Sequence, residues 1–170
     1  VTGVQTCALL ILLVINPLRA DDRHIDFDED KDCSKYESFD VRRQVINAKS
    51  PALNSSLVKE RIANAIRKEL SDDGLFKDAT QPDLLVNFRL GAQTEKDVET
   101  FRTGRRLRRT RVVVDEHAEG TLVVDLVERS SGELVWRGIY EDREGDFGKL
   151  AKKLDEDVKK LFEDYPPKKK

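Results

Sequence analysis

The residues of this chain best suited to chemistry are six arginines gathered in one short stretch around Thr103 and Gly104. They are Arg102, Arg105, Arg106, Arg108, Arg109 and Arg111. A guanidinium group donates paired hydrogen bonds to phosphate oxygens. At an anionic lipid surface each basic residue contributes about 1 kcal/mol. The stretch is therefore a candidate binding site for the phosphates of lipid headgroups or lipopolysaccharide.

An alternative explanation of the same arginines is an exposed hairpin without a ligand. In that hairpin the acids Glu95, Asp97 and Glu99 would pair with arginines across the turn. Binding of nucleic acid is disfavoured, because binders of single strands stack bases on aromatic side chains and only Phe101 lies nearby. The net charge of −2 provides no general attraction to nucleic acid or anionic membrane, so any attraction must be local.

Acidic residues near the start of the chain have the spacing of a calcium-binding loop. Asp26, Asp28, Asp30, Asp32 and Glu37 occupy relative positions 1, 3, 5, 7 and 12. However, Lys31 stands where that loop requires glycine, and Ile25 and Phe27 alternate with the acids as in a strand. We interpret the segment as an acidic edge strand that discourages pairing with other chains, and we expect no metal site.

The sequence contains no recognisable catalytic motif. His24 and His117 have no partner at catalytic spacing, and no serine lies in a nucleophile elbow. No phosphate-binding glycine loop is present. A structural zinc site needs four ligands, whereas Cys33 is the single cysteine after residue 20. We expect no catalytic residue and no cofactor; a hydrolase site assembled from distant residues remains an alternative.

The first twenty residues are expected to lie outside the folded domain. Residues 1–11 resemble the translation of a sequencing adapter, and residues 9–15 form an apolar run typical of a secretory signal with cleavage after Ala20. The run is shorter than the about 20 residues of a membrane-spanning helix; a buried strand or helix is the alternative. We predict an exported protein of the periplasm or outer membrane, associated with the membrane peripherally or by a lost lipid anchor.

Residues 21–164 are predicted to form a single α+β domain, followed by a proline- and lysine-rich tail at 165–170. Apolar residues at helical spacing predict helices over 57–70 and 147–162. Alternating patterns and turn residues predict strands over 22–28, 36–41, 75–77, 84–90, 111–115, 120–128 and 134–140. This order indicates a mainly antiparallel sheet of about five to seven strands with two helices packed on one face.

Several separated blocks of the chain form a recognisable pattern: residues 34–39, residues 61–66, Pro82-Asp83-Leu84-Leu85-Val86-Asn87-Phe88, residues 120–127, Leu134-Val135-Trp136-Arg137-Gly138 and residues 162–167. Together these blocks resemble the bacterial "domain of unknown function 4136" family. The resemblance implies an α+β envelope domain, often an exported lipoprotein, and supplies no catalytic residue. The chain departs from the family pattern at Cys33, where an aromatic residue is common. Residues 101–111 also differ, because they are rich in arginine where members are often rich in glycine and aromatic residues.

The sequence therefore predicts a non-enzymatic binding or scaffolding domain of the bacterial cell envelope. The alternative is binding of lipid or glycolipid headgroups through the arginine-rich hairpin. The expected partners are anionic lipid, lipopolysaccharide or envelope proteins, and not nucleic acid; the sequence makes no prediction of the oligomeric state.

Overall fold

A computed structural model describes residues 22–103 and 109–167 of the chain. Three features predicted above lie outside these residues. They are the signal-like segment that ends at Ala20, the final lysines at 168–170, and the three arginines Arg105, Arg106 and Arg108. No helix in the described part of the chain is both long enough and apolar enough to cross a membrane.

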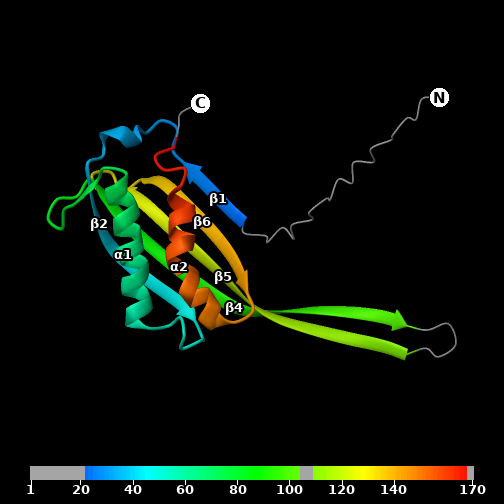
Figure 1. Ribbon diagram of the computed structural model, residues 1–170. Helices are drawn as coiled ribbons and strands as arrows, with labels where there is room; N and C mark the ends of the chain where they lie inside the picture. The colour runs from blue at the N-terminus through cyan, green and yellow to red at the C-terminus, as the bar shows by residue number, and fades with distance from the viewer. Residues whose placement is uncertain (1–21, 104–108, 168–170) are drawn as a thin grey trace, which may run out of the picture.

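The domain is a six-stranded sheet covered on one face by two helices (Figure 1). The strands are β1 (Asp22–Phe27), β2 (Ser38–Ala48), β3 (Phe76–Lys77), β4 (Leu84–Thr103), β5 (Arg109–Glu128) and β6 (Leu134–Glu144), in the order β1-β6-β5-β4-β2-β3. The helices are α1 (Ser56–Asp72) and α2 (Phe147–Phe162), and a short 3-10 turn spans Cys33–Lys35. β2 pairs in parallel with β3 and β4, and the other pairs are antiparallel. The predicted α+β class and one-sided helices are confirmed.

Each helix begins where a polar side chain caps its free backbone amides. The Ser55 hydroxyl accepts a hydrogen bond of 3.2 Å from the amide of Val58 at the start of α1. The Asp146 carboxylate accepts one of 2.9 Å from the amide of Lys149 at the start of α2. After α1, Gly74 adopts a φ of +95°, which a residue with a Cβ rarely does.

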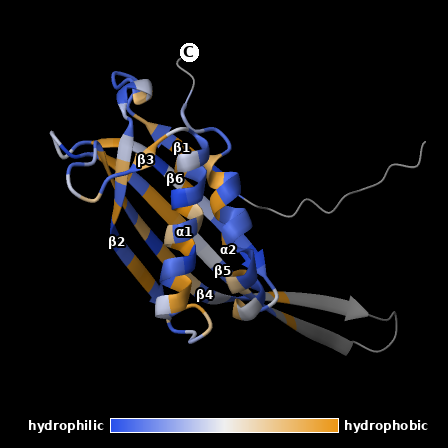
Figure 2. Ribbon diagram, turned by 60° about the vertical axis from the view of Figure 1, so that its left-hand side comes forward, coloured by the Kyte–Doolittle hydropathy of each residue, from blue (hydrophilic) through white to orange (hydrophobic). Residues whose placement is uncertain are grey.

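The core lies between the sheet and the two helices. Its fully buried side chains include Trp136, which stacks on Phe162 with ring centroids 5.1 Å apart and meets Tyr165 edge-on at 5.6 Å. Tyr165 is buried, so the packed part of the domain extends into the predicted tail. Cys33 is buried. Figure 2 shows the outer surface of α2 as largely hydrophilic, as expected for a helix that buries one stripe.

Two strands are much longer than the sequence pattern indicates. β4 continues to Thr103, and β5 is one strand where two separate strands, 111–115 and 120–128, were predicted. His117, which falls between the two predicted strands, lies within β5 opposite Glu95 of β4. Glu116, Glu119 and Gly120 look like turn residues in the sequence, although Ala118 between them is buried in the structure.

β4 and β5 continue past the ends of the neighbouring strands β2 and β6. The pairing of β2 with β4 ends where Ala48 lies opposite Ala92, and that of β6 with β5 ends where Glu144 lies opposite Ala118. Within the described residues, 93–103 and 109–117 are paired only with each other. We call this two-stranded segment the arm and the rest of the described chain the body. Figure 1 shows the arm projecting from the body; at about 3.3 Å per residue it is about 30 Å long.

Candidate functional site

The arm places the described residues of the predicted arginine-rich stretch away from the body. Arg102 lies opposite Thr110, and Thr103 lies opposite Arg109, at the far end of the strand pairing. Arg111 lies one step closer to the body, opposite Phe101. The other three arginines, Arg105, Arg106 and Arg108, belong to the connection between the strands and lie outside the described residues.

The strand register does not place the acids of the arm opposite its arginines. Glu95 lies opposite His117, and Glu99 lies opposite Val113. Asp97 lies opposite Asp115, an arrangement of like charges that destabilises an isolated pair of strands. The expected pairing of these acids with arginines directly across the hairpin is therefore absent from the register of the described strands.

The arm also exposes apolar side chains. Val98 retains 63% of its surface and Val114 retains 51%, and these two residues lie directly opposite each other. Next to them, Lys96 and Glu116 form an ion pair of 2.6 Å between Nζ and Oε1. Val98 and Val114 therefore form a small exposed apolar pair on the arm.

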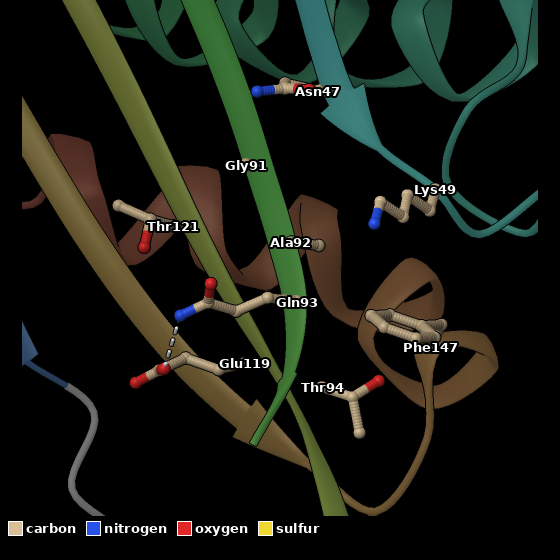
Figure 3. Close-up of a pocket in the computed structure, with 9 residues that line it drawn as sticks. All are labelled: Asn47, Lys49, Gly91, Ala92, Gln93, Thr94, Glu119, Thr121 and Phe147. Atoms are coloured by element: carbon tan, nitrogen blue, oxygen red, sulfur yellow. Dashed lines mark hydrogen bonds between the residues drawn. The ribbon is translucent and has the colours of Figure 1, made fainter.

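A cavity of about 680 Å³ lies at the base of the arm, where β2 ends and β4 continues (Figure 3). We call it the base cavity. Its lining residues come from β2, β4, β5, the start of α2 and the residue after β2: Asn47, Lys49, Gly91, Ala92, Gln93, Thr94, Glu119, Thr121 and Phe147. The sequence carried no signal for this site, because only the strand register brings these scattered residues together.

On one side of the base cavity, the charge of Glu119 is balanced by contacts within the chain. The Glu119 carboxylate accepts a hydrogen bond of 3.2 Å from Arg143 Nε and forms an ion pair of 3.1 Å with its Nη2. The Gln93 amide nitrogen donates to Glu119 Oε2 at 3.5 Å and to Glu95 Oε1 at 2.7 Å. Figure 3 shows Gln93 and Glu119 pointing toward each other. This carboxylate is therefore paired with a cation of the same chain.

The other side of the base cavity presents groups without such partners. Lys49 is exposed and forms no ion pair with any residue that the structure describes, and Figure 3 shows it on the same side of the β4 ribbon as Phe147. The amide of Asn47 and the hydroxyl of Thr94 lie nearby in the lining. An ammonium, neutral hydrogen-bonding groups and an aromatic ring suit a polar or anionic ligand. The lining contains no histidine, cysteine or serine.

Comparisons with known proteins agree with this architecture. The sequence pattern of the family described as "Domain of unknown function (DUF4136)" matches residues 23–167. The chain belongs to the DUF4136 family. Among proteins with curated descriptions, none matches the chain.

Three solved structures resemble the DUF4136 domain at 12–15% identity, which shows the fold alone. A PDZ domain protein from Parabacteroides distasonis has a TM-score of 0.61 at 15% identity, over 87% of this chain and 36% of its own. A DUF4136 family protein from Bacteroides thetaiotaomicron has a TM-score of 0.55 at 12% identity, over 86% and 96%. A putative neuraminyllactose-binding hemagglutinin homolog from Helicobacter pylori has a TM-score of 0.51 at 12% identity, over 79% and 85%. The domain spans about a third of the length of the Parabacteroides protein.

A second cavity of the DUF4136 domain, about 760 Å³, lies between the outer surfaces of α1 and α2. Leu57, which is 81% exposed, is one of its lining residues. Most of the other lining residues are charged, although most of the surface that they present to the cavity is apolar. Arg61 bridges the helices, because its Nη2 lies 2.7 Å from Asp155 Oδ2 and its Nη1 donates to the carbonyl of Ala151 at 2.8 Å.

Charged residues are also buried beneath α2. Asp142 and Glu144 of β6 are buried, and both form ion pairs with Lys153 of α2. Asp157 of α2 is buried as well, with 3% of its surface exposed, whereas its neighbours Asp155 and Glu156 are exposed. Asp157 lies three residues after Leu154 on the helix, so the 3.6-residue period brings it to the packed side. Such buried charges fix the position of α2 more than they stabilise it.

A hydrogen-bonded cluster at the opposite end of the body from the arm joins two loops. Glu128 accepts hydrogen bonds from Lys31 Nζ at 2.8 Å, from the Ser131 hydroxyl at 2.6 Å and from the Tyr36 hydroxyl at 3.2 Å. These bonds, above all that from Lys31, lower the pKa of Glu128 to about 2. Burial, together with the negative charge of Glu128, raises the pKa of Tyr36 to about 12. The cluster holds the segment before β2 against the end of β5.

The acids with calcium-loop spacing do not converge. Asp26 is exposed on β1 opposite Arg137, Asp28 accepts a hydrogen bond from the amide of Asp30, and Asp32 caps the 3-10 turn. Within the described residues, no three histidines, cysteines or acids are arranged to hold a metal ion. β1 is an edge strand, as the acidic pattern predicts.

Proposed function

We propose that this DUF4136 domain is a non-enzymatic binding or scaffolding domain of the bacterial cell envelope that contacts its partner through the arm. The observation that carries the proposal is the projection of β4 and β5 beyond the helix-covered body. Exposed strand edges invite unwanted pairing, and proteins usually shorten or cover them. A chain that instead extends its two central strands into solvent has a use for that surface.

The location in the envelope rests on two further points. Residues 9–15 form the apolar run of a secretory signal and are followed by a cleavage site at Ala20. The family resemblance likewise favours an exported protein that is anchored to a membrane or lies close to one.

The strand register shows where the arm can be cut off and the two strands rejoined by a short turn. Glu95 and His117 lie opposite each other, so an Asn-Gly turn can replace residues 96–116 and close a short hairpin. We expect the shortened protein to keep the melting temperature of the full chain, because the helices and core stay intact. In envelope preparations, a photo-crosslinker at Thr100 of the full chain should capture a partner, whereas one at Lys59 of the body should not. Equal capture at both positions would argue against a role for the arm.

Binding of phosphate headgroups is a second candidate function, favoured by the position of the arginines at the far end of the arm. The backbone positions of Arg102 and Arg109 lie about 30 Å from the body, so this end of the arm would meet an anionic surface before the acidic residues of the body do. The partner would then be anionic lipid or lipopolysaccharide rather than a protein.

Co-sedimentation with anionic and neutral vesicles across a salt series tests this candidate. The test variant replaces Arg105, Arg106, Arg108 and Arg109 by serine. A matched control replaces four exposed lysines of the body by serine, namely Lys35, Lys77, Lys149 and Lys152. We expect salt-sensitive binding to anionic vesicles that the arm variant loses and the body control keeps. Equal losses would reduce the effect to net charge, and no binding would exclude headgroup recognition.

A further inference from the structure

The outer edge of β5 in the arm is a free backbone edge within the described chain. Residues 109–117 pair with β4 on one side, and the pairing of β6 on the other side stops at Ala118. An edge strand presents a row of N–H and C=O groups that a second strand can take up. The side chains along this edge determine which second strand can pair with it.

The sequence of this edge is complementary to itself when it is reversed. It begins with Arg109, Thr110 and Arg111, continues through three valines centred on Val113, and ends with Asp115, Glu116 and His117. We propose that two copies of this chain pair through their β5 edges, antiparallel and with Val113 opposite Val113 of the second copy. The two arms then form one four-stranded ribbon. This inference goes beyond the proposed function and does not depend on it.

The proposed register matches charge with charge and valine with valine. Arg111 lies opposite Asp115 of the second copy, and by symmetry this pair occurs twice. Val112 lies opposite Val114, and Thr110 lies opposite Glu116. Opposite charges and apolar pairs at such positions each stabilise a sheet by about 0.2–1 kcal/mol. Sliding one strand by two residues in one direction would lose both charge pairs and place Asp115 opposite Val113. Sliding it in the other direction would pair Asp115 with Arg109 instead, but would place Arg111 opposite Val113 and Thr110 opposite Val114.

The proposed pairing would also add favourable contacts at two places in the arm that are unfavourable in a single chain. Asp97 and Asp115 are like charges opposite each other, and the second copy brings Arg111 to the other side of Asp115. Val98 and Val114 are an exposed apolar pair, and the second copy places its Val112 beside Val114. Each feature is unfavourable in one chain and favourable in the pair.

The edge of β4 does not have this property. If β4 paired with itself about Val98, Asp97 would lie opposite Glu99 of the second copy, which repeats a like-charge contact twice. The charges therefore single out β5. Its two-fold pairing is closed, because each copy uses its one β5 edge and no further copy can be added at that edge.

Sedimentation velocity and light scattering of the full chain, over a concentration series, test the proposal. We expect the mass to rise from one chain to two. Arg111→Asp puts aspartate opposite Asp115, and Asp115→Arg puts arginine opposite Arg111, so each variant alone should remain a single chain. Mixed in equal amounts, the two variants present arginine opposite aspartate at both positions and should form a heterodimer. The double variant R111D/D115R should again form a homodimer.

Arg102→Asp is the matched control, because it makes the same charge change on β4, away from the proposed edge. It should dimerise like the unmodified chain, and circular dichroism should show all variants folded. A single-chain mass at every concentration would overturn the proposal. So would a dimer that survives R111D, or a failure of the two single variants to pair with each other.

Discussion

The body and the arm share two strands but differ in what holds them together. In the body, β4 and β5 are the two central strands, with neighbours on both sides and two helices over one face. In the arm the same strands keep their mutual hydrogen bonds but lose the neighbours and the helices. An isolated two-stranded hairpin is only marginally stable in water. The arm therefore depends on the body for its order, whereas the body needs nothing from the arm.

This difference separates stability from interaction in one chain. Substitutions in the body should change the free energy of unfolding. Substitutions in the arm should change what the protein contacts and leave that free energy nearly constant. The following predictions test the separation.

The largest expected effect is the loss of the central aromatic side chain of the body. Trp136→Ala removes a fully buried ring that stacks on Phe162 and should lower the free energy of unfolding by about 3–5 kcal/mol. Val114→Ala, in the arm, should change it by less than about 0.5 kcal/mol. Urea unfolding, followed by far-ultraviolet circular dichroism so that the signal does not depend on Trp136, measures the free energy of unfolding of both variants. Comparable losses would mean that arm and body unfold as one energetic unit.

Two glycines of the sheet sharpen the comparison within the body itself. A Cβ added at Gly138 would lie 2.5 Å from Trp136 Cη2 and 2.6 Å from Leu161 Cδ1, on the helix-covered face. Gly138→Ala should therefore cost about 1–3 kcal/mol. Gly91 lines the base cavity, and a Cβ added there would lie 4.0 Å from its nearest contact, the carbonyl oxygen of Thr121. Gly91→Ala should be neutral in thermal unfolding, and a cost equal to that of Gly138→Ala would contradict the described packing.

A smaller, pH-dependent effect is expected at the end of the body opposite the arm. Because its contacts lower the pKa of Glu128 to about 2, the ionised form is favoured in the folded state, and the resulting stability is present above the ordinary carboxyl pKa. That stability is lost as the pH falls from about 4.5 toward 2. Glu128→Gln should have a lower melting temperature at pH 6 and a flatter decline between pH 5 and 2. Parallel melting curves for the two proteins across this range would disprove the assignment.

The smallest effect is expected at the exposed ion pair of the arm. Lys96 and Glu116 are both more than half exposed, so solvent screens their attraction and Lys96→Ser should change the free energy of unfolding by less than about 0.5 kcal/mol. Amide hydrogen exchange is the sharper measurement, because amides of the arm should exchange through local opening whereas those of β5 beside β6 should not. Equal protection along β5 would show that the arm does not open separately.

Sequence reasoning succeeded where a core imposes a pattern and failed where none exists. The bounds of α2 are those predicted, since Leu150, Leu154 and Leu161 mark its buried stripe. The body strands were found in the same way, although β2 and β6 run further than predicted. In the arm, water replaces the core, so its strands show no alternation and were missed over much of their length.

The base cavity was missed for a different reason. Asn47, Gln93 and Glu119 become neighbours only through the pairing of three strands, and no local pattern marks any of them. The arginine-rich stretch, in contrast, was visible at once because charge density needs no fold to be recognised. The sequence could therefore name a binding group but not the surface on which it is displayed.

The unbroken pairing of β4 with β5 makes the reach of this protein an evolutionary variable of its own. Adding or removing two residues in each strand of the arm changes its length by about 7 Å and returns every remaining side chain to its former face. No residue of the core has to adjust to such a change. Relatives can therefore differ in how far the arm extends from a common body, and the length of the arm can be changed by design in steps of two residues per strand.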